Sequence, residues 1–126
     1  MILQVLKILT PIYTNVLEKA LPFYEELLQT KAGTRFHYAE KKLDIAVVGQ
    51  LLLIGGTDSA LSAVQDITLS FLVDDILAYK AWLLDQGAVI RQDITKVPTG
   101  YNMLVQQPDG TIVEYVEHTR STNVEQ

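Results

Sequence analysis

The order of strands and helices expected in this 126-residue chain repeats once along its length. An extended apolar run at 2–13 precedes a helical segment, and three short extended pieces follow that segment. A second extended run at 67–73 also precedes a helical segment and three further strands. The apolar faces of the two helical segments open at Leu17 and Ile76, which lie 59 residues apart. A fixed offset between similar units predicts two related half-domains, each with the order strand, helix, strand, strand, strand.

The first helix is predicted within 16–30, where apolar side chains recur at intervals of four, three and four residues: Leu17, Leu21, Tyr24 and Leu28. Thr14 or Asn15 is expected to cap its amino end, because short polar side chains accept hydrogen bonds from the first free backbone N–H groups. Pro22 lies inside this segment and predicts a kink or an early break. The second helix, within 74–88, is expected to be capped by Asp74 or Asp75 and to end at Gly87.

The remaining extended segments complete the two half-domains and define their predicted limits. They are 34–40, 43–49, 50–56, 88–94, 101–107 and 111–118. We expect one domain, 1–126, built of two βαβββ modules at about 1–56 and 66–118, with a disordered tail at 119–126. The Gly-, Ser- and Asp-rich stretch 55–66 reads as a loop between the modules.

Composition and charge narrow the classes of function. A net charge of −5 and a pI near 4.8 argue against binding to nucleic acid or to an anionic membrane, because both require a clustered positive field. A neutral or cationic small ligand fits better. The apolar amino-terminal run contains Gln4, Lys7 and Pro11, which interrupt any signal sequence or membrane span. The chain has no cysteine, which excludes disulfides and thiolate metal sites and agrees with a cytoplasmic location.

Strand alternation predicts which side chains face the helices. In 67–73 one face is wholly apolar, whereas the other is mixed: Ile67, Leu69, Phe71 and Val73 against Thr68, Ser70 and Leu72. In the last strand Val113 and Tyr115 share one face, and Glu114 lies on the other between Ile112 and Val116. A face of mixed polarity opposite a helix suits a ligand pocket lined by apolar side chains with a few polar groups.

Three stretches resemble one known family. The sequence PDGTIVEYVE at 108–117 is similar to the signature that closes the second half of proteins of the vicinal oxygen chelate superfamily, the glyoxalase, bleomycin-resistance and dioxygenase group. VLEKALPFYEELL at 16–28 resembles the first helix of that family, and ITLSFLVDDI with LLDQGA resembles its second strand–helix unit. The resemblance implies an α+β fold of two βαβββ modules that form curved half-barrel sheets. It also implies a homodimer, with small-molecule pockets built between modules.

The resemblance also supplies four positions at which metal-dependent members of the superfamily hold a divalent ion. They fall on Leu9, on Thr68, on Leu53 or Gly55, and on Glu114. Only Glu114 has a side chain of the ligand type. Because a divalent ion needs three or more protein ligands, the expectation is a protein without metal or other cofactor. His37 and His118 lie away from these positions, and we expect structural roles for both.

The remaining candidate residues suit binding. Glu114 would hold a cationic or hydrogen-bonding ligand group or serve as a general base, and the alternative is an ordinary solvent-facing carboxylate. Tyr101 would stack on a planar ligand group, or is an ordinary strand-edge tyrosine. The pocket is completed by five further candidates: Phe36, Tyr38, Met103, Thr68 and Leu9. Trp82 is expected on a helix flank or in a subunit contact.

Two functions follow from these residues and from the resemblance. The first is a binding protein resembling the bleomycin-resistance branch, which takes up an aromatic or cationic small molecule without metal. The second is an enzyme of the same superfamily, of the lyase, isomerase or dioxygenase type, with Glu114 as metal ligand or general base. A ligand-sensing or partner-binding module is a third alternative.

Overall fold

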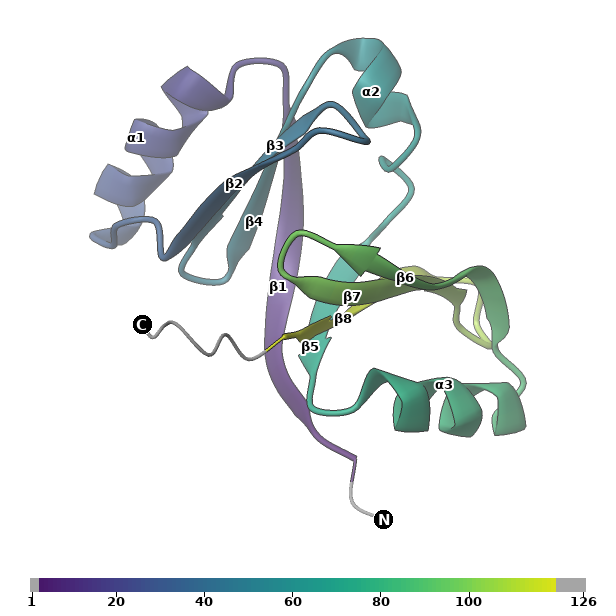
Figure 1. Cartoon of the computed structure of the whole chain (residues 1–126). Helices are drawn as coiled ribbons and strands as arrows, with labels where there is room; N and C mark the ends of the chain where they lie inside the picture. The colour runs from purple at the N-terminus through teal and green to yellow at the C-terminus, as the bar shows by residue number, and fades with distance from the viewer. Residues whose placement is uncertain (1–2, 120–126) are drawn as a thin grey trace. The chain divides into compact units, whose positions relative to one another are not determined.

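The computed structural model describes residues 3–119, and its elements follow the predicted repeat (Figure 1). The first repeat comprises β1 (Val5–Thr14), α1 (Leu17–Leu28), β2 (Thr34–Tyr38), β3 (Leu43–Val48) and β4 (Leu51–Gly55). The second comprises β5 (Leu69–Val73), α3 (Ile76–Asp85), β6 (Val89–Val97), β7 (Gly100–Gln106) and β8 (Ile112–His118). A short helix, α2 (Asp58–Ser62), lies between them in the stretch predicted as a loop. The sequence missed α2 because five residues are too few to show a helical period.

The two repeats share one sheet topology. The strand order is β2-β3-β4-β1 in the first repeat and β6-β7-β8-β5 in the second. β1 pairs with β4 in parallel, and the hairpins β2–β3, β3–β4, β6–β7 and β7–β8 are antiparallel. α1 and α3 begin at Leu17 and Ile76, so the predicted offset of 59 holds at the helices. The predicted α+β fold of paired βαβββ modules is confirmed.

Two compact units carry these repeats. One is Ile8–Ser70, and the other comprises, within the described residues, 71–119 together with 3–7. The first residues join the unit of the second repeat through the backbone of Gln4, whose N–H lies 3.2 Å from Asp74 Oδ1 and whose carbonyl accepts from the Asp74 N–H at 3.2 Å. A contact between residues so far apart in the chain leaves no local pattern in the sequence. Of the predicted tail, 119–126, all but Thr119 lies outside the described residues.

The unit Ile8–Ser70 is packed on both faces of its sheet. On the face of α1, Leu17 and Leu21 of the helix pack with three fully buried strand side chains: Ala46, Val48 and Leu53. On the other face a second cluster contains Leu9, Leu43, Ile45, Leu52 and Ile54. Leu61 of α2 is 3% exposed and belongs to this second cluster. The short helix therefore covers the sheet face that α1 leaves open.

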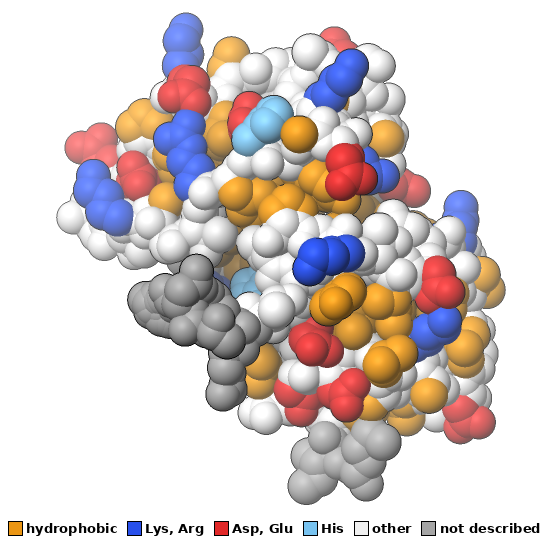
Figure 2. Space-filling view, viewed as in Figure 1, with side chains coloured by type: hydrophobic (Ala, Val, Ile, Leu, Met, Phe, Trp, Pro, Cys, Tyr) orange, Lys and Arg blue, Asp and Glu red, His pale blue; other side chains and the backbone are white. Residues whose placement is uncertain are grey.

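The other unit packs α3 against one face of its sheet. Ile76, Tyr79 and Leu83 are the buried residues of α3, and the ring of Tyr79 lies 5.8 Å from the ring of Tyr115 on β8. Phe71 of β5 meets the same tyrosine edge-on at 5.5 Å. Tyr115 is therefore on the helix-facing side of the sheet, as strand alternation predicts. Hydrophobic side chains also reach the surface in small groups between charged ones, as is usual for globular proteins (Figure 2).

The helix ends agree only in part with the prediction. Asp75 caps α3 by accepting the Ala78 N–H at 3.0 Å, and Gly87, with φ of 91°, follows the last turn. In α1 the capping position is Val16, so neither Thr14 nor Asn15 caps the helix. Asn15 instead bonds Asp58 at the start of α2 (Nδ2 to Oδ1, 2.9 Å), a tertiary contact that the local sequence does not show. α1 continues through Pro22 without a break.

Candidate functional site

Glu114 lies on the face of its sheet that points away from α3. In the register of β7 and β8, Met103 pairs with Tyr115 and Leu104 pairs with Glu114. Directly paired residues of antiparallel strands point to the same side, and successive residues alternate. Since Tyr115 packs on α3, Glu114 and Leu104 occupy the opposite face. We call this surface the Glu114 face; its core residues are Gln92, Asn102, Leu104, Glu114 and Val116.

Two amide side chains hold Glu114 in place. Asn102 Nδ2 donates to Glu114 Oε2 at 2.9 Å, and Gln92 Nε2 donates to Asn102 Oδ1 at 3.2 Å. Asn102 is 8% exposed, so its amide is almost entirely removed from water. The bond from Asn102 fixes the orientation of the Glu114 carboxylate. The arrangement presents an oriented acceptor at the sheet surface.

A break in the regularity of β6 brings Gln92 to this face. Ile90 pairs with Val105 and Gln92 with Leu104, so one extra residue, Arg91, is accommodated between them. Such a bulge re-aims the side chains that follow it. A second irregularity follows before Thr95, which pairs with Asn102. Sequence alternation through β6 therefore could not predict which of its side chains lie beside Glu114.

Three apolar side chains lie beside the polar ones, and Gln106, which pairs with Ile112, also points to this face. Leu104, Ile112 and Val116 point to the same side as Glu114 and are each partly exposed. Apolar side chains around a few fixed polar groups are typical of small-molecule sites. Sequence reasoning identified Glu114, Ile112 and Val116 on this face but missed Leu104, Asn102 and Gln92. Asn102 stands two residues before Leu104 in β7, and alternation alone would have placed it on this face.

Two predicted site residues lie on the other face of this sheet. Met103 is fully buried and pairs with Tyr115 on the α3 side. Tyr101 pairs with Glu117, which belongs to the same side, and the Lys96 ammonium lies 5.5 Å from the centre of its ring. The expectation that Tyr101 and Met103 line one cavity with Glu114 is therefore wrong, because both side chains point to the face of the sheet opposite to Glu114. Whether Tyr101, which is 38% exposed, contacts a ligand elsewhere stays a prediction.

Four other predicted residues lie in the unit Ile8–Ser70. Leu9 is a core residue, and Phe36 and Tyr38 are partly buried against the same cluster, which Leu61 of α2 also joins. Thr68 is exposed and lies immediately before β5. Three of the predicted pocket residues, Leu9, Phe36 and Tyr38, are thus packed against other protein side chains of this unit.

The position that corresponds to Glu114 in the first repeat also differs from the prediction. Leu53 packs against α1, and a Cβ built on Gly55 would meet Leu17 Cβ at 2.8 Å, so both face the helix. The side chains of β4 that point away from α1 are those of Leu52 and Ile54. The prediction of Leu53 or Gly55 is therefore wrong by one residue, because the β7–β8 loop is longer than the β3–β4 loop. The conclusion that this position lacks a ligand side chain is unaffected.

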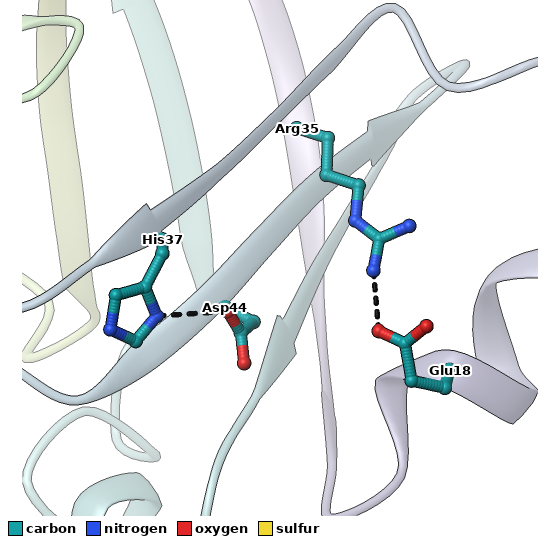
Figure 3. Close-up of polar contacts among 4 residues, drawn as sticks. All are labelled: Glu18, Arg35, His37 and Asp44. Carbon is teal, nitrogen blue, oxygen red and sulfur yellow. Dashed lines mark hydrogen bonds and ion pairs between the residues drawn. The ribbon is translucent and has the colours of Figure 1, made fainter.

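Neither histidine approaches the Glu114 carboxylate in a metal-binding group. His37 lies 2.9 Å from Asp44 Oδ1 on the neighbouring strand, near an ion pair between Arg35 and Glu18 of α1 (Figure 3). Surrounding protein atoms lower the pKa of His118 below its ordinary value, and the Lys7 ammonium has a smaller effect in the same direction. Within residues 3–119, no three His, Cys, Asp or Glu side chains gather closely enough to hold a metal ion.

Comparisons with known proteins agree with this architecture. No protein-family model matches the chain. A crystal structure of an uncharacterized protein from Methanosarcina mazei is 40% identical, with a TM-score of 0.89 over 94% of this chain and 96% of that one. The uncharacterized protein YwbC of Bacillus subtilis is 28% identical over 118 residues, 86% of this chain and 94% of its own length. Methylmalonyl-CoA epimerase from Mycobacterium tuberculosis has a TM-score of 0.77 at 14% identity, over 95% of this chain and 93% of that one.

The fold is thus that of the vicinal oxygen chelate, or glyoxalase-like, proteins, and the fold implied by the resemblance is confirmed. The chain and the Methanosarcina mazei protein belong to one family, since they are 40% identical over nearly the full length of both. In the described part of the chain, no helix has the length and apolar character needed to cross a membrane.

Proposed function

We propose that this protein binds a small organic molecule on the Glu114 face and that it does so without a metal ion. The observation that carries the proposal is the hydrogen-bonded row Gln92–Asn102–Glu114, which crosses three strands and is bordered by apolar side chains. Fixed polar groups on an apolar surface lower the entropic cost of orienting a ligand. A row that served the fold alone would not require a carboxylate, whose removal from water is costly.

The chemistry of these groups defines the ligand class. Glu114 accepts hydrogen bonds and carries negative charge, so the complementary group is an ammonium, an amidine or another strong donor. Leu104, Ile112 and Val116 favour an apolar or aromatic body next to that group. The net charge of −5 attracts cations at long range and disfavours anionic ligands. An aromatic amine combines both features.

The test is a thermal-shift screen of aromatic amines, amidines and neutral aromatic controls, followed by calorimetric titration of each hit. We expect a hit to raise the melting temperature by mass action. In Glu114→Gln, loss of the charge-assisted bond should weaken binding by roughly 1.5–3 kcal/mol, at least tenfold in Kd. Glu40→Gln, in an exposed turn, is the matched control and should bind as the wild type does. Equal binding by wild type and Glu114→Gln would contradict the proposal.

The proposed absence of metal has its own test. One carboxylate does not supply the three or more ligands that a divalent ion needs. We expect substoichiometric Zn, Ni, Mn and Fe in protein purified without chelator, and the same melting temperature before and after treatment with EDTA. A stoichiometric metal that is lost in Glu114→Ala would overturn the metal-free proposal.

The second candidate is an enzyme that uses Glu114 as a general base. It is favoured by one observation, that several solved neighbours with this fold are methylmalonyl-CoA epimerases. An oriented carboxylate can remove a proton next to a carbonyl group when the substrate holds that proton within hydrogen-bond reach. Incubation with methylmalonyl-CoA in D2O tests this candidate. Exchange of the substrate α-proton that is absent in Glu114→Gln would support catalysis, and no exchange in either protein would exclude this substrate.

A further inference from the structure

The outer side of α3 is almost entirely apolar. The buried stripe of this helix faces its sheet, and Figure 1 shows α3 along one side of that sheet. At 3.6 residues per turn, the side of the helix away from the sheet carries Leu77, Ala78, Ala81, Trp82, Leu84 and Asp85. Leu77 is 71% exposed, Leu84 51% and Trp82 47%. We call the five apolar residues of this set the α3 patch.

The equivalent helix of the first repeat shows that the fold does not require this apolar surface. With the offset of 59, Leu77 corresponds to Glu18 of α1 and Leu84 corresponds to Glu25. Each helix packs one buried stripe on a sheet of the same topology, but α1 has carboxylates where α3 has exposed leucines. Contiguous exposed apolar side chains that the fold does not need are typical of a surface that binds a partner.

Carboxylates lie at both ends of the α3 patch. Asp74 and Asp75 precede the helix, Asp85 is its last residue, and all three are exposed. Asp74 and Asp75 each accept one backbone N–H, which leaves their negative charge in place. Lys80, the one cation in the sequence of α3, bonds Asp93 Oδ1 at 2.7 Å and is thereby neutralised. The surface is therefore an apolar centre with negative charge at each end.

This charge pattern disfavours a second copy of the same surface. Two α3 helices packed together, parallel or antiparallel, bring carboxylates against carboxylates at both ends. Nucleic acid and anionic membranes meet the same repulsion. The complementary partner carries an apolar stripe with lysine or arginine at both ends of it. Asp75 and Asp85 are about 15 Å apart along the axis, so those cations must be about three helical turns apart.

We propose that the α3 patch docks a cationic amphipathic helix of a different protein. The leucines and Trp82 contact the apolar stripe of that helix, whose ridges fit between those of α3, and the end carboxylates contact its basic residues. Tryptophan is among the residues that contribute most to the binding energy of interfaces. The Glu114 face lies on the opposite side of the sheet from α3. This inference therefore goes beyond the proposed ligand binding and does not depend on it.

Trp82 is the one tryptophan of the chain, so its fluorescence reports on the α3 patch directly. The probe is a peptide of leucine and lysine, about 14 residues long, whose leucines form one face of a helix of roughly 21 Å. We expect it to shift the emission of Trp82 to shorter wavelength, because contact removes the indole from water, and to saturate below about 1 mM. The same peptide with glutamate in place of lysine should leave the emission unchanged.

Matched leucine variants test the apolar contact. Leu77→Gln/Leu84→Gln should raise the Kd of the lysine peptide at least about tenfold. Leu27→Gln is the control, because Leu27 is an exposed leucine of α1, and it should bind the peptide as the wild type does. Circular dichroism checks that each variant is folded, and Leu77→Gln alone provides the same test should the double variant not fold.

A second pair of variants tests the end charges. Asp85→Asn should weaken binding of the lysine peptide about two- to fivefold at low salt and less at high salt. Glu26→Gln changes the equivalent position of α1 and should have no effect. Glu114→Gln should also bind the peptide as the wild type does, which separates this inference from the proposed ligand binding.

Five results would overturn the proposal. Three of them concern the peptides: no emission shift with the lysine peptide, an equal shift with the glutamate peptide, or wild-type binding by Leu77→Gln/Leu84→Gln. The fourth is a Trp82 emission that changes with protein concentration alone, which would indicate self-association through α3. The fifth is a shift with phosphatidylcholine vesicles and none with the lysine peptide, which would indicate a lipid surface.

Discussion

Asn102 determines how the Glu114 carboxylate is presented. Its amide is nearly buried and uses both ends, since Nδ2 donates to Glu114 and Oδ1 accepts from Gln92. A buried amide is stable only when its polar atoms are hydrogen-bonded. The bonds to Glu114 and Gln92 therefore stabilise the Asn102 side chain, and Asn102 in turn fixes the positions of both partners. The row is therefore a cooperative unit and not three independent surface residues.

Asn102→Leu tests this unit, because it keeps a similar volume and removes both hydrogen bonds. We expect the free energy of unfolding to fall by about 1–3 kcal/mol, since Glu114 and Gln92 each lose a partner. Urea unfolding measures the change. Gln92→Leu removes only the outer bond and should cost less. An Asn102→Leu variant as stable as the wild type would show that the row does not contribute to stability.

His118 gives stability a dependence on pH. The folded state lowers the pKa of its imidazole below 6.5, chiefly because neighbouring protein atoms partly desolvate this otherwise exposed side chain, and to a smaller extent through Lys7. The unfolded chain therefore binds the proton more readily, and the free energy of unfolding rises with pH between the folded pKa and about 6.5. Above that window the contribution of His118 is constant.

The measurement is urea unfolding at a series of pH values through that window. His118→Gln cannot bind the proton, so its stability should rise less steeply with pH than that of the wild type. Identical slopes for the two proteins would show that His118 is not the group responsible.

At the scale of elements, the turns around β7 and β8 depend on two glycines for different reasons. Gly110, with φ of 94°, lies in the turn where the Gln107 N–H donates to the Thr111 carbonyl at 2.8 Å, and a Cβ there would meet nothing within 4 Å. Gly100, with φ of 151°, starts β7, and a Cβ there would lie 2.1 Å from the Glu117 carbonyl oxygen. The first glycine relieves backbone strain alone, whereas the second also allows close approach of the end of β8.

The pair of variants Gly110→Ala and Gly100→Ala separates these two effects. We expect Gly110→Ala to lower the free energy of unfolding by about 1 kcal/mol, the cost of a left-handed residue with a Cβ. Gly100→Ala must in addition move backbone and should cost roughly 3 kcal/mol. Thermal or urea unfolding of both variants gives the comparison. Equal losses of unfolding free energy in the two variants would contradict this prediction, because Gly100→Ala should also have to move the end of β8.

The elements were predictable from the sequence to the extent that their patterns are local. The start of the helical apolar faces at Leu17 and Ile76 and the faces of β8 follow from spacing and alternation, and the structure confirms them. The cap of α3 was predicted as Asp74 or Asp75, and it is Asp75. The face on which Gln92 lies was not predictable, because a bulge in β6 changes the face to which the side chains after it point. Leu53 was assigned to the wrong face for a related reason, since loops of unequal length shift the register between repeats.

At the scale of the whole molecule, the two repeats have one topology but carry different chemistry. In the first, the sheet face away from α1 is apolar and joins Leu61 of α2 in one core cluster. In the second, the equivalent face carries Gln92, Asn102 and Glu114. The sequence predicted the shared topology from the offset of 59, and it predicted Glu114 from the family resemblance. It did not predict that α2 would contribute to the first cluster, because that depends on tertiary packing of a short segment.

The central claim, that the Glu114 face is where a ligand binds, is tested most directly by mapping amide and side-chain NMR shifts during titration with an aromatic amine found in the screen. We expect the largest shifts at Gln92, Asn102, Leu104 and Glu114, with the Asn102 side-chain amide among them because it donates to Glu114. Titration of Glu114→Gln should leave these signals in place. Shifts confined to Leu9, Phe36 and Tyr38, with the Glu114 face unchanged, would contradict the claim.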